Sequence, residues 1–260
     1  MKRHPYVARS RSRITYQLAY ALRHPDKVWP HLRRLTRDAR LRSTTKDHVS
    51  YYREVMRSDI EEMTAAGAIG SHRRKSWLRV GRMQFEYLVK HGLTPHDRVL
   101  DIGCGNLRLG WRLIDHLEAG HYHGVDISPE ILLAAADTLA ERGLQHKLPH
   151  LSLVKDLKFA ALPDAYFTVV HAHSVFSHSP VEVIDECLGH VGRILHPAGF
   201  FDFTFDRTEK AEHHVLREDF YYRTETLVRL AEQHGLRAEF MDDWEQFRHK
   251  QSKLRITHGP

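Results

Sequence analysis

Apolar residues change their spacing along the chain at about residue 98. Before that point they recur at the spacing of an amphipathic helix, which predicts helices over 45–65 and 72–91. After it, short apolar or β-branched runs alternate with longer amphipathic stretches. Runs of strand length separated by segments of helix length predict an α/β fold with a doubly wound, mostly parallel sheet.

Seven strands are predicted in this second part of the chain, with a polar insertion over 207–221 after the fifth. The helix that begins at Ser128-Pro129 has the clearest boundary, because serine caps a helix N-terminus and proline suits its first position. The predicted strands cover 98–102, 121–126, 151–154, 166–172, 200–205, 236–241 and 253–257, and the helices among them cover 107–118, 128–142, 180–195 and 224–234.

Residues 1–43 are predicted to form a basic helical arm. Apolar clusters over 14–35 are interrupted by His24-Pro25 and Trp29-Pro30, which predicts two short amphipathic helices. Residues 1–42 hold twelve lysines and arginines against two aspartates, whereas the rest of the chain is slightly acidic. The arm is expected to pack on the protein or in a homodimer. Alternatives are an anionic membrane surface, an acidic partner or, for its Arg-rich start, an organelle transit peptide.

Residues 44–93 are predicted to form a helical cap or lid on a catalytic domain of residues 94–260, with a flexible link at 65–70. The two cysteines, Cys104 and Cys187, give no disulfide framework and suit a reducing compartment, so we expect a cytoplasmic protein. No apolar run approaches the ~18 residues that a membrane span needs.

The chemistry of the predicted sheet is concentrated where its first strand ends. That strand runs into Gly103-Cys104-Gly105, where backbone without a Cβ can approach a ligand closely. A helical segment follows, and an open α/β sheet binds nucleotide-like ligands at such a junction. Asp126 follows Gly105 by about the twenty residues expected of a carboxylate that binds ribose hydroxyls. Together these features predict a cofactor that contains adenosine.

Five sequence blocks have an order and spacing that indicate a family. They are Val99-Leu-Asp-Ile-Gly-Cys-Gly105, Gly124-Val-Asp-Ile-Ser128, Lys155-Asp-Leu157, Val169-Val-His-Ala-His-Ser-Val-Phe-Ser-His178 and Leu195-His-Pro-Ala-Gly199. Over about residues 90–257 the chain resembles the class I S-adenosylmethionine-dependent methyltransferases, with their Rossmann-like sheet. One departure is Leu107, where the family often has a third glycine. A dinucleotide dehydrogenase fits less well, since Arg108 stands where it needs glycine.

The resemblance implies S-adenosylmethionine as methyl donor and S-adenosylhomocysteine as product. Asp101 would lie near the methionine ammonium, with the backbone of Gly103–Gly105 under the sugar and the amino-acid part. Asp126 would accept hydrogen bonds from both ribose hydroxyls, a role that suits a carboxylate. The residues that the resemblance implies for cofactor binding are Asp101, Gly103, Cys104, Gly105, Asp126, Ile127, Asp156, Leu157, His173 and Ser174.

Five of these residues would hold the two ends of the cofactor. Ile127 would pack on the adenine face, Asp156 would accept from the adenine amino group, and Leu157 would line that pocket. His173 and Ser174, just past the fourth strand, would contact the methionine end.

The methyl acceptor is predicted by exclusion to be a hydroxyl of a small molecule, such as a sugar or a secondary metabolite. The segment 172–178 lacks the Asn/Asp-Pro-Pro-Tyr/Phe motif of nucleobase-amine methyltransferases, and it lacks a cysteine nucleophile. A hydroxyl needs a base, and an imidazole suits that role. The histidine spacing matches no metal-ligand signature, so no metal is expected. His178 is the first candidate for the base, with His173, His213, His214 and Asp206 as alternatives.

Two other functions stay open. The first is a methyltransferase that reaches a membrane-associated or nucleic-acid substrate through the basic arm, although no nucleic-acid recognition motif accompanies the arm. The second is a cofactor-binding module without catalysis. The presence of Asp101, Asp126 and Asp156 argues against it.

Overall fold

The strand β1 (Val99–Ile102) is buried along its whole length and lies at the centre of the sheet. It pairs in parallel with β2 (Tyr122–Asp126) on one side and with β4 (Phe167–Ala172) on the other. A strand covered on both faces is mostly apolar, as Val99, Leu100 and Ile102 are, although Asp101 interrupts them. The computed structural model describes residues 25–69, 73–245 and 251–259.

The main sheet has the strand order β3-β2-β1-β4-β5-β9-β8. Beyond β2 lies β3 (His150–Leu153), and beyond β4 lies β5 (Leu195–Arg207). The last two strands, β9 (Ser252–His258) and β8 (Leu236–Phe240), are antiparallel to their neighbours. The predicted fold class is confirmed. The strand order reverses between β1 and β4, where the loops that follow the two strands diverge and leave room for a ligand.

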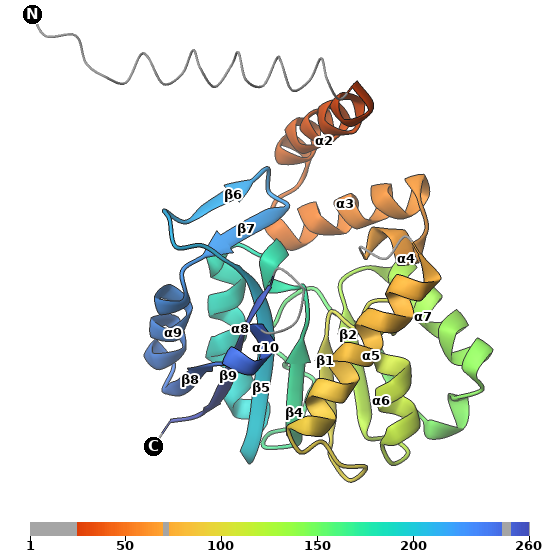
Figure 1. Cartoon of the computed structure of the whole chain (residues 1–260), viewed down its shortest axis with the longest axis vertical. Helices are drawn as coiled ribbons and strands as arrows, with labels where there is room; N and C mark the ends of the chain where they lie inside the picture. Colours follow the sequence, from red (N-terminus) through yellow and green to blue (C-terminus); the bar gives the residue numbers. More distant parts are fainter. Residues whose placement is uncertain (1–24, 70–72, 246–250, 260) are drawn as a thin grey trace, which may run out of the picture. The chain divides into compact units, whose positions relative to one another are not determined.

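Two further strands, β6 (His213–Val215) and β7 (Asp219–Tyr222), form an antiparallel hairpin, which brings the described residues to nine strands (Figure 1). The hairpin is the polar insertion of the sequence, for which no strands were predicted. Its β7 pairs with the last residues of β5, with Asp206 opposite Tyr221. The long β5 therefore carries the hairpin past the carboxyl edge of the sheet.

Helices cover both faces of the sheet (Figure 1). One face is covered by α8 (Val181–Ile194) and α9 (Thr224–Gln233), the other by α5 (Arg74–Lys90), α6 (Gly110–His116) and α7 (Pro129–Arg142). The apolar stripe of α8 is buried almost completely, and each such side chain contributes roughly 1.5–3 kcal/mol. Its buried residues are Ile184, Cys187, Leu188, Val191 and Ile194.

The helix α3 (His48–Glu62) spans the carboxyl edge of the sheet. Its N-cap Asp47 accepts a hydrogen bond from the backbone N–H of Ser50 at 2.7 Å. The Arg53 guanidinium donates to the carbonyl of Ile127 after β2, at 2.7 Å, and His48 Nε2 donates to the carbonyl of His178 after β4, also at 2.7 Å. Two separate loops of the sheet are thereby tied to one helix.

Short elements complete the part of the chain that the structure describes. They are α4 (Ala65–Ala68), α10 (Asp242–Glu245) and the 3-10 turns η1 (Gln145–Lys147) and η2 (Phe176–His178). The segment 65–70 was predicted to be a flexible link; residues 65–68 are helical, capped by Thr64, and residue 70 lies outside the described residues. None of the described helices combines the length and apolar character that crossing a membrane requires.

The chain divides into two units, residues 1–46 and 47–260. The first contributes α2 (Pro25–Thr44), which runs without interruption through Trp29-Pro30. The prediction that this Trp-Pro pair ends a helix is wrong. A proline in the second turn removes one backbone hydrogen bond, and the turns that follow are unaffected. The N-terminal segment 1–13 and the first helix predicted for the arm lie outside the described residues.

Candidate functional site

The glycine loop after β1 and the carboxylate at the end of β2 contact each other directly. Gly103 and Gly105 have φ of 66° and 57°, a left-handed conformation that glycine adopts without strain. The Gly105 N–H donates to Asp126 Oδ2 at 3.0 Å, and the Ser128 N–H donates to Oδ1 at 2.9 Å. Burial raises the pKa of Asp126, and these N–H groups oppose that rise. The carboxylate is thus fixed against the loop.

Leu107 resolves the one departure from the family pattern. Its φ is 62°, so the backbone has the left-handed conformation for which the family often uses glycine. The side chain is completely buried among apolar residues of α5, α6 and α7. A left-handed residue with a Cβ costs about 1–2 kcal/mol, and burial of a leucine side chain returns a similar amount. The loop therefore keeps its shape without the third glycine.

Asp101 lies behind the glycine loop. Its carboxylate is 4% exposed and accepts a hydrogen bond from the Tyr122 hydroxyl at 2.8 Å. Burial raises the pKa of Asp101 to about 7, against the lowering effects of that hydrogen bond and of the nearby Arg108. Burial likewise raises the pKa of the Cys104 thiol. Cys104 is therefore a packing residue of the loop, since a thiol that stays protonated is a poor nucleophile.

The residues expected at the adenine end lie on two loops at the same edge. Ile127 follows Asp126 and holds Arg53 through its carbonyl oxygen. Leu157 is buried, and its N–H donates to Glu186 Oε1 of α8 at 2.8 Å. The carboxylate of Asp156 accepts from the backbone N–H of Lys158 at 3.2 Å. Both loops are anchored by groups outside them, so their positions are set before a ligand arrives.

The residues expected at the methionine end belong to a polar network that the sequence did not indicate. The Ser174 N–H donates to Thr204 Oγ1 at 2.8 Å, and Ser174 Oγ accepts from Gln251 Nε2 at 2.9 Å. Gln251 also holds Thr204 and Ser177 at 2.9 Å each. His173 packs edge-on against Trp244, with ring centroids 5.8 Å apart. The loop after β4 is thereby fastened to the C-terminal segment.

The helices before β1 pack closely on the glycine loop. Ile69, after α4, comes within 3.7 Å of the space above Gly105, and its carbonyl accepts from Arg108 Nη1 at 3.0 Å. Gly81 of α5 leaves room for the backbone of Arg108, because a Cβ at Gly81 would lie closer than 3.0 Å to the Arg108 carbonyl oxygen. The Trp77 indole donates to Asn106 Oδ1 at 2.8 Å. These contacts place Ile69 and α5 directly on the loop.

His178, the first candidate for the base, lies at the end of η2. Its Nδ1 donates to the Glu218 carbonyl oxygen at 2.6 Å and lies 3.4 Å from Asp219 Oδ1. Because a carbonyl oxygen only accepts, Nδ1 carries the proton and the neutral ring has its lone pair on Nε2. Burial lowers the pKa of His178, but Asp219, the Glu218 carbonyl and the charge of Asp206 outweigh burial and raise it.

Tyr52 of α3 links the base to the cofactor side of the edge. Its ring stacks on that of His178, with centroids 5.4 Å apart and planes 24° apart. Burial raises the pKa of Tyr52, and four carboxylates around it act in the same direction. Those carboxylates include Asp219, beside the base, and Asp126, at the glycine loop. Tyr52 thus contacts the base, and its neighbour Arg53 binds the loop after β2.

The remaining candidates for the base lie on the hairpin and β5. His213 and His214 are exposed on β6, where the ring of His213 stacks on that of Tyr221 at 4.6 Å. Asp206 lies at the end of β5, beside the hairpin, and acts on His178 through its charge. Among the described residues, no group of three or more histidine, cysteine or acidic side chains is arranged to hold a metal ion.

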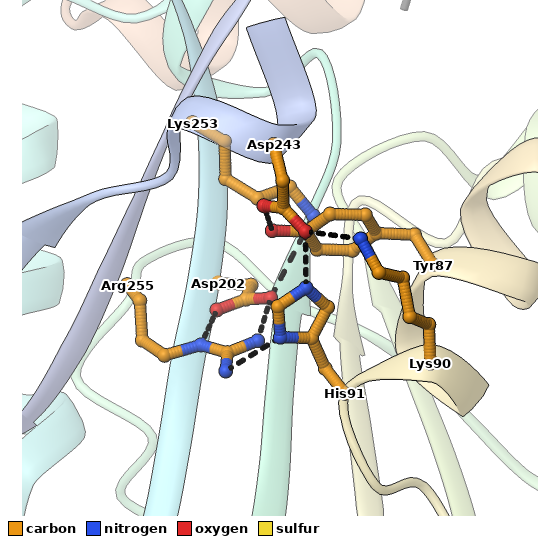
Figure 2. A network of polar contacts seen from close by, with 7 residues as sticks. All are labelled: Tyr87, Lys90, His91, Asp202, Asp243, Lys253 and Arg255. Carbon is orange, nitrogen blue, oxygen red and sulfur yellow. Dashed lines mark hydrogen bonds and ion pairs between the residues drawn. The ribbon is translucent and has the colours of Figure 1, made fainter. Parts of the chain in front are cut away.

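A second polar cluster lies under α5 on the same face as Asp101 (Figure 2). Asp202 of β5 is completely buried and accepts from Arg255 Nε and Nη2 at 2.7 and 2.8 Å. Lys253 Nζ, also completely buried, lies 3.7 Å from Asp202 Oδ2 and 4.0 Å from the ring centre of Trp244. Asp243 of α10 binds a second set of groups, from the end of α5 and its C-cap residue. They are Tyr87 Oη at 3.0 Å, Lys90 Nζ at 2.8 Å and His91 Nε2 at 2.8 Å.

This cluster joins the C-terminal segment to α5. Arg255 Nη1 donates to His91 Nδ1 at 3.2 Å, so His91 Nε2 carries the proton that it gives to Asp243. The chain of contacts thus continues from the β5–β9 pair through His91 to α10. The cluster holds Trp244 in place, and Trp244 packs against His173 on the loop that the resemblance implies for the methionine end.

Comparison with known proteins identifies the class. Residues 100–201 match the family model described as a methyltransferase domain. A curated relative, the probable methyltransferase ltbC of Aspergillus luteorubrus, is 27% identical over 151 residues, which is 56% of this chain. The chain spans 50% of the length of that relative.

Solved structures share the fold at low sequence identity. Magnesium protoporphyrin IX methyltransferase of Synechocystis, crystallised with bound S-adenosylmethionine, has a TM-score of 0.60 at 18% identity and covers 83% of this chain and 99% of its own. An S-adenosylmethionine-dependent methyltransferase of Leishmania major has a TM-score of 0.62 at 14% identity, with 82% and 86% covered. The [4+2]-cyclase SpnF has a TM-score of 0.54 at 20% identity, with 70% and 81% covered.

Residues 100–201 therefore match a methyltransferase domain, and solved structures of S-adenosylmethionine-dependent methyltransferases share the fold, which supports the predicted class. The groups at the edge of the sheet fit the cofactor of that class. Asp126 presents a carboxylate, which can accept from hydroxyl groups, and the neighbouring loop has left-handed backbone without Cβ atoms at Gly103 and Gly105. The presence of a cyclase among proteins of this fold means that the reaction has to be argued from the site.

Proposed function

We propose that the protein binds S-adenosylmethionine at the glycine loop and transfers its methyl group to a hydroxyl of a small molecule. The observation that carries the proposal is the shared edge of the sheet. Asp126 is held against the glycine loop, and His178 lies across the same edge with Nδ1 already protonated. The helix α3 contacts both, through Arg53 on the loop after β2 and Tyr52 on the His178 ring.

When bound, S-adenosylmethionine supplies a methyl group on a sulfonium, which becomes the neutral thioether of S-adenosylhomocysteine after transfer. The chain has to orient the acceptor, exclude water and receive one proton. His178 Nε2 takes the hydroxyl proton as the acceptor oxygen forms its bond to the methyl carbon. No described residue hydrogen-bonds Nε2, so its lone pair is available for that proton.

The other expectations about the protein remain proposals. We place the reaction in the cytoplasm, which is supported by the free, buried Cys104 and Cys187. Homodimerisation through the N-terminal helices and a role of the arm in reaching a membrane-bound acceptor stay predictions. Removal of residues 1–46 tests whether either role is essential, since unchanged turnover on a soluble acceptor would exclude an essential role of the arm.

The test uses methyl-labelled S-adenosylmethionine with a panel of small molecules that carry hydroxyl, amine or carboxylate groups. We expect mass spectrometry to find the label on oxygen of a hydroxyl compound. His178→Gln should then lower kcat about 100-fold while the Kd for the cofactor stays within about twofold. His190→Gln, in α8, is the matched control and should keep full activity. Label on nitrogen, or full activity of His178→Gln, would contradict the proposal.

A further inference from the structure

The hairpin β6–β7 reaches the base from outside the parallel sheet. Two consecutive residues contact the same atom, His178 Nδ1: Glu218, just before β7, and Asp219, the first residue of β7. The Glu218 carbonyl oxygen lies 2.6 Å away and Asp219 Oδ1 lies 3.4 Å away. The short contact is a full hydrogen bond, and the longer one is a weak branch of it with a strong charge effect.

The two contacts have different consequences for the ring. The carbonyl cannot donate, so it fixes the proton on Nδ1 whether or not a carboxylate is near. The carboxylate adds a negative charge that stabilises the imidazolium formed when Nε2 receives a proton. In a His–Asp pair with one contact, one carboxylate provides both effects. Here the hairpin supplies a backbone group for the tautomer and a side chain for the charge.

The other groups that face His178 do not supply this charge at Nδ1. From α3, the Tyr52 ring stacks on the imidazole and His48 binds the backbone carbonyl of His178. From β5, Asp206 acts only through its charge. The carboxylate of Asp219, in contrast, directly contacts the ring nitrogen that carries the proton.

We propose that Asp219 is a positioning residue for catalysis, which holds His178 ready to take the acceptor proton while the Glu218 carbonyl sets the tautomer. The catalytic role of Asp219 rests on the proposed function, whereas its contact with His178 does not depend on that function. The hairpin thereby acquires a function, since the insertion after β5 completes the base of a site whose cofactor half lies in the parallel sheet. Hairpin substitutions are therefore expected to change proton transfer and to leave cofactor binding intact.

The test compares Asp219→Asn with Asp219→Glu and with a control pair elsewhere. Asp185 of α8 has its Oδ1 2.7 Å from Nε2 of His234, which follows α9. Asp185→Asn therefore removes a comparable charge outside the site. The His178 ring is followed by NMR in the full-length protein without acceptor, its signal assigned by its loss in His178→Gln. In Asp219→Asn we expect a lower titration midpoint with the Nδ1–H tautomer kept. Asp219→Glu should restore the midpoint, and Asp185→Asn should not change it.

Activity provides the second measurement. Asp219→Asn should lower kcat about tenfold and move the acid limb of the pH profile of kcat/KM to lower pH, with the KM for S-adenosylmethionine unchanged. An unchanged His178 titration in Asp219→Asn would overturn the inference, whatever the activity. A shifted titration without any change in the pH profile would overturn the role of His178 as base, and with it the catalytic part of the inference. The two failures are thus distinguishable.

Discussion

Gly81 should not tolerate even a methyl group, because α5 packs directly on the backbone of the glycine loop. A Cβ at Gly81 would lie closer than 3.0 Å to the Arg108 carbonyl oxygen, and neither side of that contact is a flexible side chain. Alanine gains about 1 kcal/mol of helix propensity over glycine. Overpacking costs about 1–3 kcal/mol and is expected at the upper end here, since two backbone segments must separate. Gly81→Ala should therefore lower the free energy of unfolding by about 2 kcal/mol.

Gly192→Ala is the matched control, since it makes the same change in another helix, α8. A Cβ there would meet only Leu236 Cδ2, at 3.4 Å, which is ordinary contact with the end of a flexible side chain. Gly192→Ala should be neutral or up to about 1 kcal/mol more stable. Urea unfolding of the two variants and of the parent protein measures both effects. If Gly81→Ala is as stable as Gly192→Ala, α5 does not pack on the backbone of the glycine loop at Arg108.

Two further predictions concern buried carboxylates. Burial raises the folded-state pKa of Asp101 to about 7, so the free energy of unfolding of the parent protein should fall as pH rises from ~4 to 7. Asp101→Asn does not titrate, so its free energy of unfolding should rise relative to that of the parent over the same range; a difference that stays constant with pH would refute the shift. Asp202→Asn leaves Arg255 and Lys253 without their buried counter-charge and should cost about 3–5 kcal/mol in urea unfolding. Asp164→Asn, at an exposed ion pair, should cost under about 1 kcal/mol, and equal effects of the two would exclude a structural role for the cluster.

The parts of the fold that the sequence predicted are those with local signals. Apolar runs of strand length, Ser128-Pro129 at a helix start and glycines after β1 each act within a few residues. The proposed cofactor half of the site also follows from them, because Asp126 and the glycine loop end two neighbouring strands. Asp202 offered a further signal: an acidic residue in an otherwise apolar strand has to find a buried partner, here Arg255.

The parts that the sequence did not predict depend on contacts between distant segments. The hairpin turns at 216–218 with Leu216 at a φ of 55°, so the glycine or asparagine that announces such a turn is absent. Tyr52 meets His178, and Arg53 meets the loop after β2, only once α3 lies across the sheet. A helical pattern predicts that α3 exists, but not which loops it covers.

The central claim is that S-adenosylmethionine binds at the glycine loop through Asp126, and a calorimetric titration tests it most directly. The parent protein should bind one equivalent of the cofactor. Asp126→Ala should weaken binding about 100-fold, because a carboxylate that accepts from two ribose hydroxyls is lost. Asp137→Ala, at an exposed position of α7, is the control and should bind like the parent. Absence of binding by the parent, or equal affinity of Asp126→Ala and Asp137→Ala, would contradict the account.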